Sequence, residues 1–178
     1  MLPAVSAMHG RSSRRPCYAH QVDKTVSRRR QRRLAGFDYA NPSHAYFVTI
    51  RAVHGTAPFR RPEIAQSVLS SLHWLRTERQ VQIQAHCVMP DHLHVLLRLP
   101  PDSPPLGRLI GAFKRLTTRQ SWEHGIRGRL WQPRFYDHIV RRSEDAGEIA
   151  RYIRDNPVRA GLVTDADAYP YSGFADPR

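Results

Sequence analysis

VMPDHLHVLLRL, residues 88–99, is the stretch that decides the fold. Met89-Pro90-Asp91 has the composition of a tight turn, and residues that favour β-strands stand on both sides of it. In the strand predicted over His92–Leu99, positions 93, 95, 97 and 99 are all Leu or Val, so they share one apolar face. The strand predicted over Val81–Val88 pairs with it as a hairpin. The stretch therefore predicts the middle of an antiparallel sheet.

Strands and helices alternate on both sides of this hairpin. Helical spacing of apolar residues predicts three helices, and β-branched and aromatic runs predict two more strands. The last helix is expected to follow an N-cap at Ser143 and to end before Pro157, because proline disfavours helix at the preceding residue. In chain order the predicted elements are a strand over His44–Val53, a helix from Pro62 to about Gln80, the strands Val81–Val88 and His92–Leu99, a helix over Leu106–Glu123, a strand over Phe135–Val140 and a helix over Glu144–Asn156.

The first six elements have the order found in ferredoxin-like folds, a split β-α-β arrangement. The expected fold class is therefore α+β, with a four-stranded antiparallel sheet and two helices on one face. The last helix, which carries Tyr152, remains free to lie near the other face. On the strand over Val81–Val88, simple alternation puts Ile83, Ala85 and Cys87 on one side and leaves His86 exposed on the other.

The charge of the chain points to an acidic partner. Of its 178 residues, 28 are Lys or Arg and 15 are Asp or Glu, which gives a formal net charge of +13. Nucleic acid fits such a charge. A membrane is disfavoured, because no apolar run approaches the roughly 20 residues of a spanning helix and no secretory signal pattern stands at the start. We therefore expect a cytoplasmic protein in which Cys17 and Cys87 are reduced thiols.

Two regions of the chain differ in composition. Residues 1–36 form a basic arm, expected to be flexible until it meets phosphate, and residues 37–178 form the folded domain. Trp122 and Trp131 either stack on unpaired bases or pack in the core. Basic side chains of both regions, with Lys114 expected to face solvent, are candidates for contacts with DNA phosphates. These candidates are Arg28, Arg29, Arg30, Arg32, Arg33, Lys114, Arg115, Arg119, Arg134, Arg141 and Arg142.

His92 and His94 are the residues in which we expect the chemistry to begin. Both lie on the strand face opposite Leu93 and Val95, so their imidazoles stand side by side. Imidazole is a common ligand of divalent metals, and two of them on one strand predict a metal site. The pattern alone leaves a second interpretation open, in which both histidines are ordinary surface residues.

Tyr152 and Asn156 lie one turn apart on the last helix, at the shoulder of the buried face that Ile149 and Ile153 define. If this helix crosses the open sheet face, both side chains point toward the two histidines. Asn156 then offers a third metal ligand, and Tyr152 offers a hydroxyl to a phosphate on the metal. From spacing alone, Tyr152 also fits a tyrosine at the edge of the core, and Asn156 a C-terminal helix cap.

Four segments of the chain resemble the single-tyrosine HUH transposases, the IS200-like superfamily, and most of all their REP-associated tyrosine transposase branch. The similarity spans about residues 28–174 and leaves residues 1–27 outside. The segments are YFVTI at 46–50, VMPDHLHVLL at 88–97, WQPRFYDH at 131–138 and YIRDNPVRAGLV at 152–163.

The resemblance implies both a function and a site. Such enzymes cut and rejoin single-stranded DNA beside palindromes that fold into hairpins, and they depend on Mg²⁺ or Mn²⁺. The implied metal ligands are His92, His94 and Asn156, and the implied nucleophile is Tyr152, which would form a 5′-phosphotyrosine. The resemblance also implies a monomer that uses its own tyrosine, although some relatives work as dimers that exchange the tyrosine helix.

Other interpretations stay open at this point. Tyr136 is a rival nucleophile and His138 a rival ligand, although strand alternation puts both beside Arg134 with no ligand partner. The whole chain also fits an inert module that only binds nucleic acid. A third interpretation is a metal-dependent nuclease in which water attacks the phosphate and Tyr152 only packs.

Overall fold

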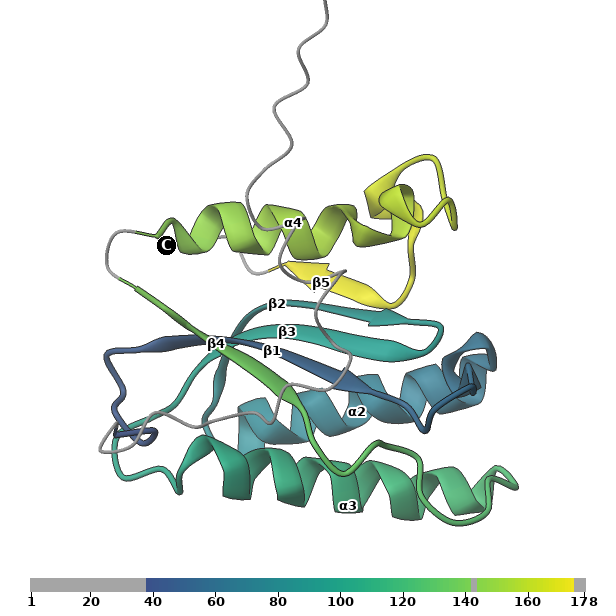
Figure 1. The fold of residues 1–178 in the computed structure, drawn as a ribbon, viewed down its shortest axis with the longest axis horizontal. Helices are drawn as coiled ribbons and strands as arrows, with labels where there is room; N and C mark the ends of the chain where they lie inside the picture. Colours follow the sequence, from purple (N-terminus) through teal and green to yellow (C-terminus); the bar gives the residue numbers. More distant parts are fainter. Residues whose placement is uncertain (1–37, 142–143, 175–178) are drawn as a thin grey trace, which may run out of the picture. The chain divides into compact units, whose positions relative to one another are not determined.

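Five antiparallel strands form one sheet, in the order β4-β1-β3-β2-β5 (Figure 1). The computed structural model describes residues 38–141 and 144–174, so the predicted basic arm, residues 1–36, lies outside the described residues. The elements are β1 (Ala45–Arg51), η1 (Pro58–Arg60), α2 (Pro62–Glu78), β2 (Gln82–Met89), β3 (His92–Arg98), α3 (Leu106–Glu123), β4 (Tyr136–Val140), α4 (Ala146–Arg159), η2 (Ala166–Ala168) and β5 (Ser172–Phe174).

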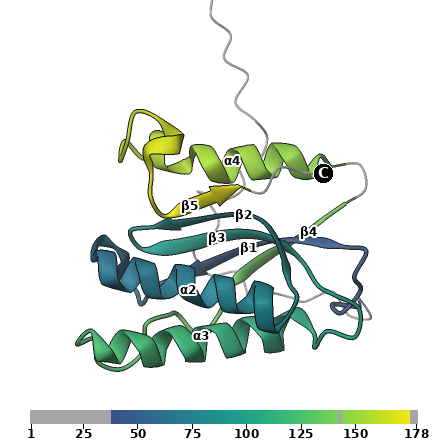
Figure 2. The same ribbon diagram turned by 180° about the vertical axis from the view of Figure 1, so that it is seen from behind.

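Helices cover both faces of this sheet. α2 and α3 pack side by side on one face, and α4 lies on the other (Figures 1 and 2). The α+β fold, the four expected strands and the three expected helices are thereby confirmed, with ends that shift by a few residues. β5 is a fifth strand that the sequence does not predict, because three residues including Gly173 are too few to show an alternation. None of the helices in the described ranges has both the length and the apolar character needed to cross a membrane.

The sheet separates the interior into two layers, and β1 contributes side chains to both. Tyr46, Val48 and Ile50 are buried in the main core with α2 and α3, whereas Phe47 and Thr49 face α4. On β3, residues 93, 95 and 97 lie in the main core, as predicted, together with Leu99 just after the strand, and the even-numbered residues face α4. The two histidines of β3 therefore lie on the α4 side of the sheet.

β2 departs from simple alternation. A bulge between Ile83 and Ala85 shifts its register against β3. Ile83 therefore lies in the main core opposite Leu97, whereas Ala85 and Cys87 face α4. The expectation that these three β2 residues share one face is wrong, because an extra residue in one strand of a pair reverses the alternation beyond it.

The same shift places the side chain of His86 next to β5, where His86 pairs with Gly173. Its ring packs against Gly173, where an added side-chain carbon would overlap the imidazole. Burial, together with the charge of Arg76, lowers the pKa of His86 to about 4. The expectation of an exposed His86 is therefore wrong, and the imidazole is neutral at pH 7.

The N-terminal end of α4 is set by Asp145. Its carboxylate accepts a hydrogen bond from the Gly147 amide at 2.7 Å, so Asp145 is the N-cap and the helix begins at Ala146. The predicted cap, Ser143, lies outside the described residues. The helix thus starts two residues later than the predicted Glu144.

The C-terminal end of α4 runs past Pro157, where the sequence predicts a stop. Proline removes its own amide from the ladder and crowds the carbonyl four residues earlier, but the helix continues, and the Ala160 amide donates to the Asn156 carbonyl at 2.9 Å. The helix ends at Arg159, and Gly161 then turns the chain with a φ of 68°, which suits glycine. Asn156 therefore lies inside the helix and is not its cap.

We expect the stability of the fold to fall as the pH is lowered from about 6.5 to about 4. The pKa of His86 is lower in the folded chain, so the unfolded chain takes up the proton first and the free energy of unfolding decreases. In His86→Gln the free energy of unfolding is expected to fall less steeply over this pH range, because about one proton fewer is taken up on unfolding. Urea unfolding at several pH values measures the difference. His73→Gln replaces an exposed histidine of α2 and is the control, and an equal change in both variants would contradict the assignment.

Candidate active site

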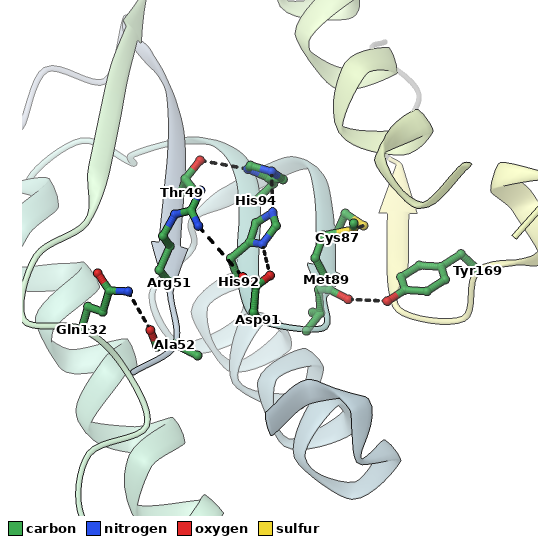
Figure 3. A network of polar contacts seen from close by, with 11 residues as sticks. Thr49, Arg51, Ala52, Cys87, Met89, Asp91, His92, His94, Gln132 and Tyr169 are labelled. Carbon is green, nitrogen blue, oxygen red and sulfur yellow. Dashed lines mark hydrogen bonds and ion pairs between the residues drawn. The ribbon is translucent and has the colours of Figure 1, made fainter. Parts of the chain in front are cut away.

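The two histidines of β3 meet at their Nε2 atoms. The Nε2 atoms of His92 and His94 are 3.0 Å apart, and the ring centroids are 4.5 Å apart (Figure 3). His94 is buried, and His92 is partly exposed at the start of the strand. Two ligand atoms that bind one ion at about 2.1 Å and at a right angle lie about 3.0 Å from each other. The pair therefore has the spacing of two adjacent ligands of one cation.

Each of these histidines is oriented by a second hydrogen bond. His92 Nδ1 donates to the Asp91 carboxylate at 2.6 Å, and the Thr49 hydroxyl lies 2.9 Å from His94 Nδ1 (Figure 3). Partners of this kind hold the ring of a metal-binding histidine and leave Nε2 to the ion. Sequence reasoning missed Thr49, because only the pairing of β1 with β3 brings it to His94.

The surroundings keep His94 neutral. Burial, and then the nearby charges of His92 and Arg51, hold the pKa of His94 well below its usual value. The hydrogen bond from His92 lowers the pKa of Asp91, so that carboxylate is ionised at pH 7. Arg51 Nη1 lies 4.0 Å from the other Asp91 oxygen and brings a positive charge to the rim of the site. A neutral imidazole carries the lone pair that a metal ion needs.

A third ligand for the pair would have to be something other than His, Cys, Asp or Glu. Residues 38–141 and 144–174 contain no group of three such side chains that could hold a metal ion. Asn156 of α4 is the candidate, since it is partly buried and its Nδ2 donates to the Tyr152 carbonyl at 2.9 Å. That bond uses the amide nitrogen and leaves the amide oxygen as the ligand atom.

Tyr152 of α4 lies beside the histidine pair. The centroid of its ring is 6.3 Å from that of His94 and 6.2 Å from that of Phe47. The guanidinium carbon of Arg159 lies 4.8 Å from the same ring centroid, a cation–π distance. Arg159 is also missed by sequence reasoning. Its signal is the helical spacing, since residues seven apart stand about two turns from each other on one side of a helix.

Two sulfur-containing residues of β2 lie next to the histidine pair. Cys87 pairs with His94, and Met89 pairs with His92, across the β2–β3 ladder. The Cys87 Sγ atom lies 3.5 Å from the Met89 Sδ atom, and Cys87 is a free, buried thiol. Burial raises the pKa of Cys87 to about 12, so it is protonated at pH 7 and is a poor metal ligand. Cys17 lies outside the described residues.

The rival candidates both lie on β4. Tyr136 is exposed, and burial of its hydroxyl end, followed by the charges of Asp137 and Glu144, raises its pKa. A raised pKa makes the nucleophilic phenolate less accessible. His138 Nε2 lies 2.8 Å from Glu144 Oε2, so the ring is held by a carboxylate at the start of α4. The raised pKa of Tyr136 weakens its assignment as the nucleophile.

The predicted phosphate contacts fall on different sides of the molecule. Arg115 and Arg119 are exposed on α3, across the sheet from α4 (Figure 1). Arg134 and Arg141 are exposed close to the two ends of β4. The remaining arginine candidates lie outside the residues whose side chains are described: Arg28, Arg29, Arg30, Arg32, Arg33 and Arg142.

Lys114 is half-buried under the loop that precedes β4. Its Nζ donates to the carbonyl oxygens of Gln132, Pro133 and Arg134 at 2.6, 3.2 and 3.3 Å. Burial also lowers the pKa of Lys114 to about 8. The expectation that Lys114 faces solvent is wrong, because this loop folds over the helix and takes up the ammonium group.

Trp122 and Trp131, the two candidates for base stacking, differ in their burial. Trp131 is buried in the main core, where its Nε1 donates to Thr117 Oγ1 at 2.7 Å. Trp122 is exposed near the end of α3, and its Nε1 donates to the Gly128 carbonyl at 2.9 Å. Of the two alternatives weighed for Trp131, core packing is therefore the one found.

Known families and sequences match the region of this site. The family described as "Transposase IS200 like" matches residues 45–156. The REP-associated tyrosine transposase of Escherichia coli (strain K12) is 30% identical over 100 residues, which cover 56% of this chain and 58% of that protein. A Haemophilus influenzae protein assigned to the same group is 32% identical over 100 residues, 51% of this chain and 57% of its own length. The chain thus spans a little over half the length of these curated relatives.

A solved structure has the same fold. The structure of a REP-associated tyrosine transposase bound to a REP hairpin is similar with a TM-score of 0.61 and 23% sequence identity. The likeness covers 76% of this chain and 79% of that chain. At this level of identity it shows a shared fold.

We expect Thr49→Val to weaken the binding of Mn²⁺ about 10- to 100-fold, because His94 loses the partner that orients its ring. Isothermal titration calorimetry measures the affinity. Thr49→Ser keeps the hydroxyl and is the matched control. If the valine variant binds Mn²⁺ as tightly as the unchanged chain, Thr49 has no role in the site.

Lys114→Met is expected to lower the free energy of unfolding by about 1–3 kcal/mol, because three carbonyl oxygens lose their shared donor. Urea denaturation measures the change. The neighbouring exposed residue supplies the control, since Arg115→Met removes a charge from the same helix without touching this loop. If both variants had the same free energy of unfolding, the hydrogen bonds of Lys114 to this loop would not stabilise the fold.

Proposed function

Because the chain belongs to the IS200-like transposase family, we propose that it cuts and rejoins single-stranded DNA through Tyr152 at palindromic repeats that form hairpins. The family match covers residues 45–156, more than half of the chain. One observation carries the proposal: the Tyr152 ring lies against His94, whose Nε2 atom is 3.0 Å from that of His92. A tyrosine hydroxyl next to a candidate metal site is what phosphoryl transfer to a side chain needs.

The proposed reaction exchanges one phosphoester bond for another. The Tyr152 oxygen forms a bond to phosphorus, the bond from phosphorus to the 3′ oxygen breaks, and the phenolic proton is lost while the departing 3′ oxygen gains one. The products are a 5′-phosphotyrosine and a free 3′-hydroxyl. Because the phosphotyrosine keeps the ester, a 3′-hydroxyl can later attack it and rejoin the strand without ATP.

The residues around Tyr152 have separate roles in this proposal. A free tyrosine has a pKa of about 10, so its hydroxyl is a weak nucleophile at pH 7. Phe47 holds the edge of the ring, and the Arg159 charge favours the phenolate that forms during attack. His92, His94 and Asn156 would hold a divalent cation, which when bound supplies positive charge to the phosphate oxygens.

We propose Mg²⁺ or Mn²⁺ as that cation. The two Nε2 atoms lie 3.0 Å apart, close enough to serve as neighbouring ligands of one such ion. The donor set of two imidazoles and one amide also leaves positions for phosphate and water.

The proposed substrate follows from the family and from charge. A relative of the same fold is described as bound to a REP hairpin, and the present chain has a net charge of +13. We propose that arginines of the chain contact DNA phosphates, which gives affinity and position without reading bases. They are Arg28, Arg29, Arg30, Arg32, Arg33, Arg115, Arg119, Arg134 and Arg141. Lys114 is not among them, because its ammonium group already donates to three carbonyl oxygens.

We also propose that one subunit suffices for the reaction. Tyr152 and His94 of the same chain are in ring contact, so no second copy is needed to bring the nucleophile to the histidines. A monomer in which the tyrosine acts on its own site is therefore the expected state.

The experiment incubates the protein with a labelled single strand that carries a hairpin, in the presence of Mn²⁺ or Mg²⁺, and follows covalent adducts on a denaturing gel. The unchanged chain is expected to form an adduct, and Tyr152→Phe is expected to form none. Tyr136→Phe removes the rival hydroxyl and is the matched control that keeps the adduct. His92→Ala is expected to abolish metal-dependent cutting while sparing most of the charge-driven binding.

Each other outcome selects a different function. An adduct in Tyr152→Phe would contradict the assignment of the nucleophile. Cutting without an adduct would favour a metal-dependent nuclease in which water attacks. Binding of the strand with neither cutting nor an adduct would favour an inert nucleic-acid-binding module.

A further inference from the structure

Tyr136 is an exposed aromatic residue on the same sheet face as the histidine pair. It begins β4, which is the edge strand next to β1, and 42% of the residue is exposed. Thr49 pairs with Tyr136 on one side and with His94 on the other. Directly paired residues of neighbouring strands point to the same face. Tyr136, Thr49 and His94 thus form one row across three strands.

The row leads from open surface to the buried pair. Neighbouring strands are about 4.8 Å apart, so the backbone of Tyr136 lies about 10 Å from that of His94. α4 packs against β2, β3 and β5, at the other edge of the sheet (Figure 2). Further along β4, His138 and Glu144 are joined by a hydrogen bond of 2.8 Å. The open part of this face is therefore the end of β4 that carries Tyr136.

Charged groups of both signs lie near Tyr136: the acidic Asp137 and Glu144, which help to raise its pKa, and two arginines toward the start of β4. Arg51 lies one step beyond Thr49 on the same face of β1, with a side chain that is 35% exposed. Arg134, two residues before Tyr136, is also exposed. An exposed aromatic ring suits a single strand, whose bases stack on the ring while its phosphates meet Arg51 and Arg134 nearby. In a duplex the bases are stacked on each other, so none is free to stack on the ring.

The segment in front of Tyr136 is braced rather than loose. The Gln132 amide donates to the Arg51 carbonyl at 2.9 Å, and the Gln132 side chain donates to the Ala52 carbonyl at 2.9 Å. Lys114 holds three successive carbonyl oxygens of the same loop. The ring thus stands on a backbone fixed relative to β1, which is what a stacking surface needs.

We propose that Tyr136 is the platform on which one unpaired base stacks, next to the phosphate that reaches His92 and His94. The proposal rests on the proposed function and adds the path of the strand, which enters from the β4 edge and passes Thr49. Its chemistry needs the ring of Tyr136 and not the hydroxyl. Tyr136 is thereby a binding residue and leaves the nucleophilic role to Tyr152.

The test measures binding in the Tyr152→Phe background, so that no cutting interferes. Hairpin oligonucleotides with 2-aminopurine at successive positions of a single-stranded flank report stacking by loss of fluorescence. We expect quenching at one or two positions, retained in Tyr136→Phe and lost in Tyr136→Leu. The leucine variant is also expected to bind about 5- to 150-fold more weakly. Phe174→Leu is the matched control, since Phe174 is also 42% exposed but lies on β5, the opposite edge strand.

Four results would contradict the proposed stacking role of Tyr136. Unchanged affinity and quenching in Tyr136→Leu would remove the ring from the path. An equal loss in Tyr136→Phe would assign the effect to the hydroxyl, and an equal loss in Phe174→Leu would make it unspecific. Failure of the proposed cutting reaction is a separate outcome, because it leaves binding and quenching intact in the Tyr152→Phe background. If the chain binds no single strand at all, the stacking role of Tyr136 is contradicted.

Discussion

The pairing of β1 with β3 is the interaction on which the rest of the structure depends. It sets Thr49 opposite His94 and so brings a hydroxyl to the Nδ1 atom of a buried imidazole. A slip of one residue would turn Thr49 into the main core and Ile50 toward α4, because strand side chains alternate. The apolar residues of β1 that α2 and α3 bury, among them Val48, oppose such a slip. The core on one face of the sheet therefore fixes the chemistry on the other face.

The site lies at the border between a closed and an open part of the same sheet face. Phe47 and His94 are each only 2% exposed, whereas Tyr136, on the edge strand, is 42% exposed. On the closed side, charge interactions are stronger because water is excluded, and a neutral His94 is available for a cation. On the open side, the proposed single strand can approach without local unfolding of the chain. The position of α4 over β2 rather than β4 creates this asymmetry.

Local patterns predict much of this molecule, and long-range register accounts for the remainder. Alternation on β3 predicts the apolar residues that form the core and the common face of the two histidines, since both depend only on neighbours in the chain. The partner of His94 is out of reach of such reasoning, because Thr49 lies 45 positions earlier. The β2 bulge leaves no mark in the sequence, so His86 is predicted on the wrong surface. Lys114 looks like any helix-surface lysine until a loop 18 residues later folds over it.

The helix that carries Tyr152 is held at both ends by its own chain. At the start, Asp145 caps the helix and Glu144 binds His138 of β4. After the end, the chain folds back: Arg154 pairs with Asp167, and the last strand, β5, joins the sheet beside β2. These contacts fix α4 over the sheet and so set the distance of 6.3 Å between the ring centroids of Tyr152 and His94.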